Sequence, residues 1–311
     1  MVGTGFRTIF YFMPIVPGRQ RPTLTSGDLR HKIFSMAGKS VVPWQLRMYS
    51  RSLKKKMKVA ALKKFLGGNQ GRKCLLLTCG DNNGAINYHL RAAAGGDWAW
   101  GEFEDGARAD MKELLGAPVA LLDRETCRLP FADGHFDLLV SIDVHEHLHH
   151  PERLASEFFR VLKPGGRAVV TTPNGNERKL VARLKRWSGM GNLEYGHVRT
   201  GFDIPDLEAL LAGAGLRPGR TGSYAKFFTE FLELAINWTY VKVLNRRDRA
   251  PGSGIAPSSL KKLQAVKKSY RAYSLLYPLF WAFSQLDRLL FFNRGYAVIV
   301  EAEKPADAAT K

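Results

Sequence analysis

The sequence predicts an α/β protein built on a doubly wound, mostly parallel β-sheet with helices on both of its faces. From residue 74 onward, short apolar runs alternate with segments of helical periodicity, the pattern of parallel strands joined by crossover helices. These apolar runs lack the polar alternation of a half-exposed strand, as expected for a sheet that is covered on both faces. A long segment rich in aromatic residues interrupts the alternation before the last strand, and it predicts a helical insert.

A basic helical segment precedes the sheet. Its periodicity runs from residue 43 to residue 66, and the pair Gly67-Gly68 ends it, because glycine readily adopts the backbone conformation that closes a helix. The apolar positions fall near one face. We expect the lysines to lie on the opposite face, toward solvent or a membrane surface (Lys54, Lys55, Lys56, Lys58, Lys63 and Lys64).

Five strands follow, and they set the position of the expected site. We predict them at residues 74–79, 98–103, 118–123, 136–143 and 165–173. Helices are expected around them at residues 85–94, 105–116, 152–162 and 177–187. Ligands of such sheets bind at the carboxyl ends of the strands, so the loops that follow these strands should carry the chemistry.

The C-terminal part of the chain completes the predicted organisation. A helix begins near Pro205 and stops at residues 213–215, and an apolar run at residues 295–304 predicts a final strand. We divide the chain into four parts: a loosely structured basic extension (1–43), a core (44–223), a helical apolar insert (224–292), and the final strand with its tail (293–311).

Charge is distributed unevenly along the chain, whose net charge is +19. Residues 1–70 carry 14 Lys and Arg against one acid, and residues 176–311 carry 22 against 12, whereas the segment between them is mildly acidic. Basic flanks suggest a polyanionic neighbour such as an anionic membrane, a nucleic acid or a phosphorylated substrate. No apolar run reaches the roughly 18–20 residues that span a bilayer, and three cysteines form no disulfide framework. We therefore expect a cytoplasmic protein that associates with a membrane from its surface.

One continuous stretch carries a specific signature. Residues Leu129 to Asn174 read LPFADGHFDLLVSIDVHEHLHHPERLASEFFRVLKPGGRAVVTTPN, with LPF, FD, EHL, RVLKPGG and TPN in that order. Together with the segment from Arg72, this stretch resembles the class I S-adenosylmethionine-dependent methyltransferases of the small-molecule and lipid type. The resemblance implies a Rossmann-like fold, an enzyme that transfers a methyl group, and S-adenosylmethionine as the cofactor.

The loop after the first strand is the expected cofactor loop. Gly80 and Gly84 would let the backbone approach the ligand closely, and the residues between them, Asp81, Asn82 and Asn83, could hydrogen-bond its polar ends. The loop departs from the family's usual first motif, which reads acid, apolar, Gly, any, Gly, any, Gly. Leu76 stands at the position of the acid and Thr78 at that of the first glycine. Cofactor binding would therefore either use a rearranged loop or be weakened.

Acidic residues after the second and third strands are candidate contacts for the nucleoside. By the logic of dinucleotide folds, an acid at the end of the second strand binds the ribose hydroxyls, and Glu102 fits this position best, with Glu104 as the alternative. For the adenine, the family's spacing leads to Glu125. Asp123 has the commoner residue type, and both remain candidates.

The fourth strand leads to the candidate catalytic residues. Asp143 ends this strand and should face both cofactor and acceptor. His147 is the candidate general base, because histidine titrates near neutral pH, and the alternative is a contact that shapes the loop. His145 stands where the family usually has an apolar residue. A metal site built from these histidines with His149 and His150 lacks an accompanying acidic cluster, so we expect no metal.

The leading hypothesis is a methyltransferase that acts on a lipid, a lipid-linked compound or another small-molecule acceptor at a membrane surface. The aromatic insert would line an apolar acceptor channel, enter the membrane interface or pack on itself. A nucleic-acid methyltransferase held by the basic flanks is a competing hypothesis, although no known nucleic-acid module is visible. A catalytically silent binding protein on the same fold is the third.

Overall fold

The computed structural model describes residues 42–80, 82–244 and 260–306. The predicted N-terminal extension falls at residues 1–41 outside this part of the chain, and Asp81 also lies outside it. The extension and its boundary therefore remain predictions.

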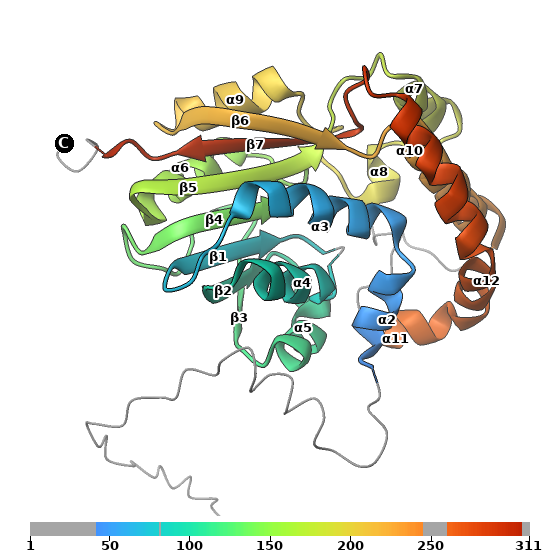
Figure 1. Ribbon diagram of the computed structural model, residues 1–311, viewed down its shortest axis with the longest axis horizontal. Helices are drawn as coiled ribbons and strands as arrows, with labels where there is room; N and C mark the ends of the chain where they lie inside the picture. Colours follow the sequence, from blue (N-terminus) through green and yellow to red (C-terminus); the bar gives the residue numbers. More distant parts are fainter. Residues whose placement is uncertain (1–41, 81, 245–259, 307–311) are drawn as a thin grey trace, which may run out of the picture. The chain divides into compact units, whose positions relative to one another are not determined.

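Seven strands form one sheet within the described residues, in the order β3-β2-β1-β4-β5-β7-β6 (Figure 1). The strands are β1 (Lys73–Thr78), β2 (Asp97–Glu102), β3 (Val119–Leu121), β4 (Phe136–Ile142), β5 (Leu162–Pro173), β6 (Arg217–Tyr224) and β7 (Ala297–Glu303). Strands β1 to β5 pair in parallel, and β7 runs antiparallel to both β5 and β6. This topology confirms the predicted, mostly parallel α/β sheet.

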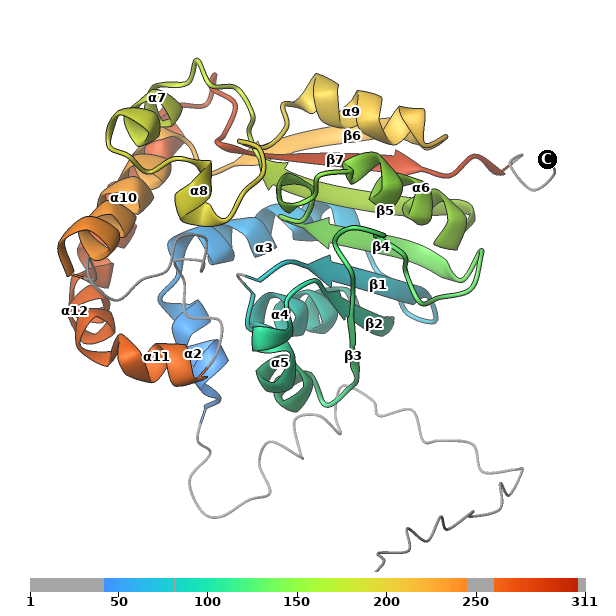
Figure 2. The same ribbon diagram turned by 180° about the vertical axis from the view of Figure 1, so that it is seen from behind.

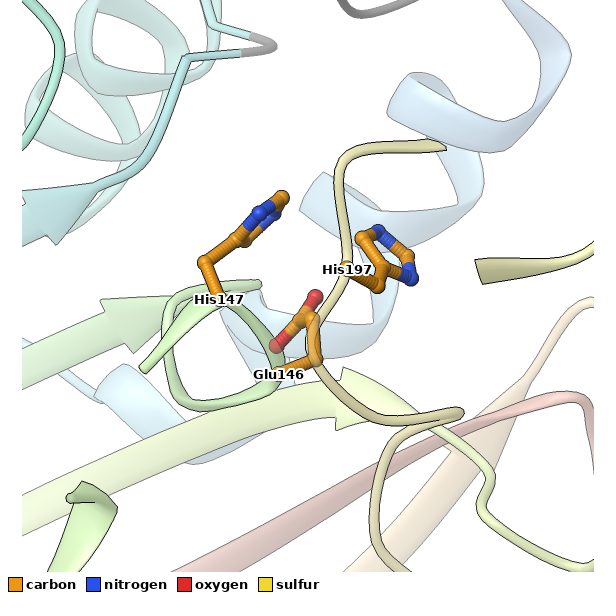
Figure 3. Close-up of side chains that lie close together, drawn as sticks. All are labelled: Glu146, His147 and His197. Carbon is orange, nitrogen blue, oxygen red and sulfur yellow. The ribbon is translucent and has the colours of Figure 1, made fainter. Parts of the chain in front are cut away.

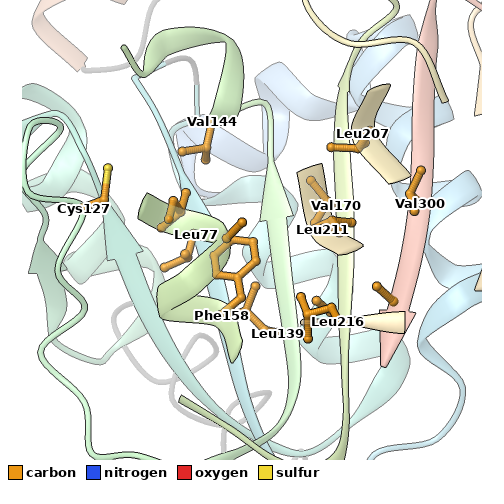
Figure 4. Close-up of a cluster of buried hydrophobic side chains, with 14 of the residues drawn as sticks. Leu77, Cys127, Leu139, Val144, Phe158, Val170, Leu207, Leu211, Leu216 and Val300 are labelled. Carbon is orange, nitrogen blue, oxygen red and sulfur yellow. The ribbon is translucent and has the colours of Figure 1, made fainter. Parts of the chain in front are cut away.

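Helices cover both faces of the sheet. They are α2 (Trp44–Ser50), α3 (Leu53–Leu66), α4 (Ala85–Ala94), α5 (Arg108–Leu115), α6 (Pro151–Val161), α7 (Leu180–Trp187), α8 (Asn192–Tyr195) and α9 (Ile204–Gly213). Helices α3, α4 and α5 bury their apolar side chains against one face, whereas α6 and α9 pack on the other. Figure 4 shows the second of these cores, in which Phe158 of α6 lies beside the strand residues Leu139 and Val170.

Alternation along each strand explains the two cores. In β1, Leu75 and Leu77 belong to the core under α6 and α9, whereas Leu76 belongs to the core under α3 and α4. Successive side chains of a strand point to opposite faces, so a continuous apolar run is what a sheet covered on both sides requires.

The aromatic insert is helical in its described part. It comprises α10 (Phe227–Trp238), a π-helical turn (η3, Thr239–Leu244), α11 (Leu260–Ala265), α12 (Lys267–Ser284) and a 3₁₀ turn (η4, Gln285–Leu289). In both views, α10 and α12 stand beyond the carboxyl ends of the parallel strands, beside α2 and α8 (Figures 1 and 2). The insert therefore covers the edge of the sheet where a ligand is expected.

Strand β6 was not predicted from the sequence. It contains Pro218, Gly219 and Gly222, residues that weaken a central strand, and its pairing with β7 is irregular between Pro218 and Thr221. It forms the outer edge of the sheet, where a missing backbone donor and an irregular register are tolerated. The surrounding sheet rather than local propensity makes this segment a strand.

The prediction for the lysines of α3 was wrong at two positions. Lys58 is buried and pairs with Asp143, and Lys54 forms an ion pair with Glu230 of α10 at 3.1 Å. Helix α3 lies between the sheet and the insert, so the face that was expected to meet solvent also contacts protein. Lys56, Lys63 and Lys64 are exposed.

Candidate functional site

A cavity of about 970 Å³ opens at the carboxyl ends of β1, β4 and β5. The sheet side of its lining includes Asn82, Asn83, Asp143, Glu146 and His147. The opposite side comes from α3 and from the insert, including Lys58, Glu230, Tyr240, Tyr273 and Phe280. One cavity thus lies between the loops that follow the strands and aromatic side chains of the insert. We call these side chains the aromatic roof (Tyr240, Tyr273 and Phe280).

The loop after β1 is held by its own asparagines. Asn82 bonds to the side chain of Asn87 and accepts from the backbone N–H of Gly84 at 3.2 Å. Asn83 accepts from the N–H of Ala85 at 3.3 Å, in the first turn of α4. Gly84 has a φ of 87°, a conformation that glycine adopts without strain, and it precedes α4 directly. These contacts fix the N-terminus of α4 against the cavity.

Glu102 holds the loop after β1 in place through hydrogen bonds. Its fully buried carboxylate accepts from the N–H of Gly80 at 2.7 Å, from the Thr78 hydroxyl at 2.7 Å and from the N–H of Glu104 at 2.9 Å. Burial raises the pKa of Glu102 despite these bonds. Glu102 lies at the end of β2 as predicted, and in this structure its contacts are to the protein. Its role at the ribose stays a prediction.

Glu104 lies against the other side of the loop. Gly80 has a φ of 76°, a conformation that strains other residues, and a Cβ atom there would stand 2.6 Å from the Glu104 carboxylate and displace that side chain. Arg124 pairs with Glu104 and also contacts the sulfur of Cys79 at 3.2 Å. An arginine partner was not expected from the sequence, since Arg124 belongs to no part of the motif that suggested the site.

Asp123 and Glu125 lie in an exposed turn after β3, and neither lines the cavity. The Asp123 carboxylate accepts from the N–H groups of Glu125 at 2.9 Å and Thr126 at 2.7 Å. The bond from the Thr126 backbone, the largest cause, lowers the pKa of Asp123. The structure thus does not bring these two acids to Asp143, and their contact with adenine stays a prediction.

Asp143 lines the cavity, and its contact with cofactor and acceptor stays a prediction. It has a φ of 50°, and its backbone N–H donates to the carbonyl of Thr171 on β5 at 2.9 Å. Its carboxylate pairs with Lys58. Burial alone would lower the pKa of Lys58, but the Asp143 carboxylate overcomes burial and raises it, so Lys58 stays charged. Lys58 was not predicted as a partner of Asp143, because strands β1 to β3 separate α3 from the Leu129–Asn174 motif along the chain.

Glu146, His147 and His197 converge in the lining of the cavity (Figure 3). Glu146 is fully buried, and one of its oxygens accepts from the Thr172 hydroxyl at 3.2 Å. Burial, and next the Asp143 carboxylate, raise the pKa of Glu146. His147 donates from Nδ1 to the carbonyl of Gly196 at 2.9 Å, because a carbonyl can only accept. His197 lies edge-on to it, with ring centroids 4.7 Å apart.

The other histidines of the motif lie elsewhere. His145 is fully buried beside Phe158 and Phe202, and burial lowers its pKa to about 3, so it is a neutral core residue. His149 and His150 are exposed. Sequence reasoning missed His197 because it lies 50 residues downstream, in a loop without periodicity.

A buried charge cluster ties the insert to the core. Glu230 of α10 pairs with Lys54 of α3 and Lys185 of α7, and its side chain is only 2% exposed. Burial alone would raise the pKa of Glu230, but Lys185 and Lys54 lower it to about 2. All three residues line the cavity, so this cluster fixes the roof over the site.

Comparisons with known proteins place a methyltransferase domain in this part of the chain. Residues 79–170 match the model of a methyltransferase domain. A relative from Mycolicibacterium smegmatis, named a probable S-adenosylmethionine-dependent methyltransferase, is 35% identical over 154 residues, which are 47% of this chain and 58% of that protein.

A second relative and one solved structure complete the comparison. The ubiquinone/menaquinone biosynthesis C-methyltransferase of Cupriavidus necator is 32% identical over 109 residues, 33% of this chain and 44% of that protein. The chain therefore spans only part of the length of the curated relatives it matches. The solved phosphoethanolamine N-methyltransferase 2 of Haemonchus contortus has a TM-score of 0.49 at 18% identity, over 80% of this chain and 52% of that one.

Proposed function

We propose that this chain, which carries a class I S-adenosylmethionine-dependent methyltransferase domain, transfers the methyl group of S-adenosylmethionine to a small-molecule or lipid-linked acceptor. The cavity carries the proposal. Its one side is the loop after β1, where the methyl donor would bind, and its other side is the aromatic surface of α12, including Tyr273 and Phe280. An acceptor with an apolar part would be held between them.

The protein's contribution would be chiefly positioning. The sulfonium carries the reactive methyl group, so the site has to align the acceptor with the methyl carbon and exclude water. Gly80, Asn82 and Gly84 would approach the amino-acid part of the cofactor, whereas Asp81, which the sequence also suggested, lies outside the described residues. Asp143 would face both substrates, and its pairing with Lys58 keeps its carboxylate in a defined place.

His147 is the candidate base for the acceptor. Its Nδ1–H is committed to the carbonyl of Gly196, which makes Nε2 the nitrogen that can take up a proton. The ring is nearly buried and lines the cavity. This geometry supports the predicted catalytic role of His147 and equally supports a role in shaping the loop around Gly196.

Methyl transfer can be tested directly with the full chain. We expect methyl-labelled S-adenosylmethionine to label the lipid or small-molecule fraction of a cell extract, and Asp143→Ala to reduce this labelling at least about tenfold, the effect of losing a charged contact. Asp105→Ala, which changes an exposed acid away from the cavity, is the matched control. Label that appears only in RNA would support the nucleic-acid alternative. Absence of transfer by a chain that binds the cofactor would support the silent relative.

The acceptor would be reached at a membrane surface. Apolar side chains of α12 and the segment after it are strongly exposed, including Leu275 (81%), Phe291 (85%) and Phe292 (75%). Exposed cations lie in the same region, at Arg271, Arg288 and Arg294. In the described part of the chain, no helix is long and apolar enough to cross a bilayer. Insertion of these apolar side chains into the interface would leave the basic ones at the headgroups.

Sedimentation with vesicles tests this surface. We expect the full chain to bind anionic vesicles at low salt, and a fraction of the binding to survive high salt, because apolar insertion is not screened. Replacing Phe291 and Phe292 together by serine should remove the salt-resistant fraction. Leu121→Ser, at an exposed apolar residue of β3, should leave it unchanged. A chain that stays in the supernatant at low salt would show that the proposal of a membrane surface is wrong.

A further inference from the structure

Three side chains that can bind a metal meet at one wall of the cavity. Glu146 and His147 come from the turn after β4, and His197 comes from the loop after α8. Each offers a ligand atom within 4.8 Å of the others. Bonds of 2.0–2.2 Å to one cation would place these atoms about 3–4 Å apart, so small rotations of the side chains would complete the site. Figure 3 shows the Glu146 carboxylate between the two imidazole rings.

The carboxylate of Glu146 gives independent evidence for a missing ligand. Glu146 is fully buried, and its Oε1 atom has no hydrogen-bond partner among the residues that the structure describes, whereas Oε2 accepts from Thr172. Buried polar atoms nearly always have a partner, and an orphaned carboxylate oxygen is especially costly. Asp143 cannot supply a donor, and Lys58 is directed to Asp143 instead. A cation bound next to Oε1 would satisfy it.

The surroundings of His147 are those of a metal ligand. Metal-bound imidazoles usually donate their second ring N–H to a carbonyl or carboxylate, which fixes the ring and the tautomer. His147 donates Nδ1–H to the carbonyl of Gly196, directly before His197 in the chain, so one short loop both orients the first imidazole and supplies the second. With Nδ1–H donated to this carbonyl, Nε2 is the ligand atom, so a bound cation would take the place of the proton that His147 could accept in the metal-free site.

We propose that Glu146, His147 and His197 bind a divalent transition-metal cation, and that this cation holds an oxygen atom of the acceptor. Two imidazoles and one carboxylate favour Zn²⁺, Co²⁺, Mn²⁺ or Fe²⁺ over Ca²⁺ or Mg²⁺, which prefer oxygen ligands alone. This replaces the expectation from the sequence that the chain holds no metal. His145, His149 and His150, which that expectation considered, lie elsewhere, and the distant His197 completes the set.

The second half of the proposal rests on the proposed methyl transfer. Three protein ligands leave coordination positions open, and the three residues line the same cavity as the aromatic roof. A cation lowers the pKa of a bound hydroxyl. The hydroxyl proton would leave to water, the oxygen would bond to the methyl carbon, and the C–S bond would break with its electron pair left on sulfur. The products are a methyl ether, S-adenosylhomocysteine and a proton, which points to hydroxyl-bearing acceptors.

Metal binding is tested on the full chain after removal of metals with a chelator. We expect one equivalent of Co²⁺ to bind and give a visible absorption band, and Zn²⁺ to displace it. His197→Gln and the nearly isosteric Glu146→Gln should each weaken Co²⁺ binding at least about tenfold. Changing a residue that only supports a metal ligand already lowers metal affinity about tenfold or more, and removing the ligand itself should lower it at least as much. His149→Gln, at an exposed histidine of the same segment, should bind like the unmodified chain.

Calorimetry with S-adenosylhomocysteine on the same samples separates this inference from the proposed function. Binding of the nucleoside without stoichiometric Co²⁺ would overturn the metal site and leave the methyltransferase proposal intact. Stoichiometric Co²⁺ binding without nucleoside binding would support the metal site and overturn the methyltransferase proposal. Equal Co²⁺ affinity in the unmodified chain and in both ligand variants would also refute the site, and circular dichroism of the variants shows that each is folded.

Discussion

Replacing Glu230 by alanine is expected to destabilise the protein by about 3–5 kcal/mol, the effect of removing one partner from a buried ion pair. Glu230 is almost fully buried and neutralises both Lys54 and Lys185. The variant leaves Lys185 of α7 without the Glu230 carboxylate and leaves Lys54 of α3 with Glu233 alone, at 3.3 Å. The loss should appear as a lower midpoint of chemical denaturation. Helix α10, which Glu230 ties to α3 and α7, would no longer be fixed over the cavity.

A surface ion pair is the matched control for Glu230. Arg217 and Glu303 lie 3.5 Å apart with side chains 70% and 41% exposed, and Glu303→Ala should change the free energy of unfolding by no more than about 1 kcal/mol. Equal effects of the two substitutions would contradict the assigned role of Glu230.

The same cluster predicts an acid limit. The pKa of Glu230 is lowered to about 2 in the folded chain from an ordinary value near 4.5. Its contribution to stability is therefore complete above pH 4.5 or so, and it is lost as the pH falls toward 2. Glu230→Ala should flatten this part of the curve of stability against pH.

Glu102→Ala is expected to weaken cofactor binding by about tenfold or more, since losing a charged hydrogen-bond acceptor costs roughly 1.5–3 kcal/mol. The carboxylate accepts from Gly80 and Glu104, so it determines the path of the loop that would contact the cofactor. The effect is expected whether Glu102 contacts the ribose or only holds the loop. Glu102→Gln separates the two, because an uncharged side chain of the same size keeps much of the packing.

Glu125 supplies the control for Glu102. It is exposed and outside the cavity, although the family's spacing placed it at the adenine. Glu125→Ala should leave cofactor affinity within about twofold if the adenine contact is absent. A tenfold loss there would restore the contact that was predicted from the sequence, and an unchanged affinity in Glu102→Ala would remove Glu102 from the account.

The sheet was predictable from the sequence because its determinants are local. Apolar runs such as Leu75–Leu77 and Leu138–Val140 specify buried strands without reference to the rest of the chain. Strand β6 was not predicted, because a segment with Pro218 and two glycines has little tendency of its own to form a strand. Its pairing with β7 at the edge of the sheet keeps it extended.

The site was predictable only in part. Asp143 and His147 lie at the end of a recognisable strand, and the structure places both in the cavity. Lys58, Glu230 and His197 reach the same cavity from distant segments without a motif of their own. Only the folded chain brings them together, so no spacing rule could have found them. The lysines of α3 show the reverse error, because the helix was predicted correctly but two of its lysines contact protein: Lys54 pairs with Glu230 of the insert and Lys58 with Asp143.

Titration of the full chain with S-adenosylhomocysteine in a calorimeter tests whether the cavity binds the cofactor. We expect saturable binding at one site per chain, weakened about tenfold or more by Glu102→Ala. Heat that stays at the level of dilution up to millimolar ligand would contradict it, and the cavity at the ends of β1, β4 and β5 would then need another ligand.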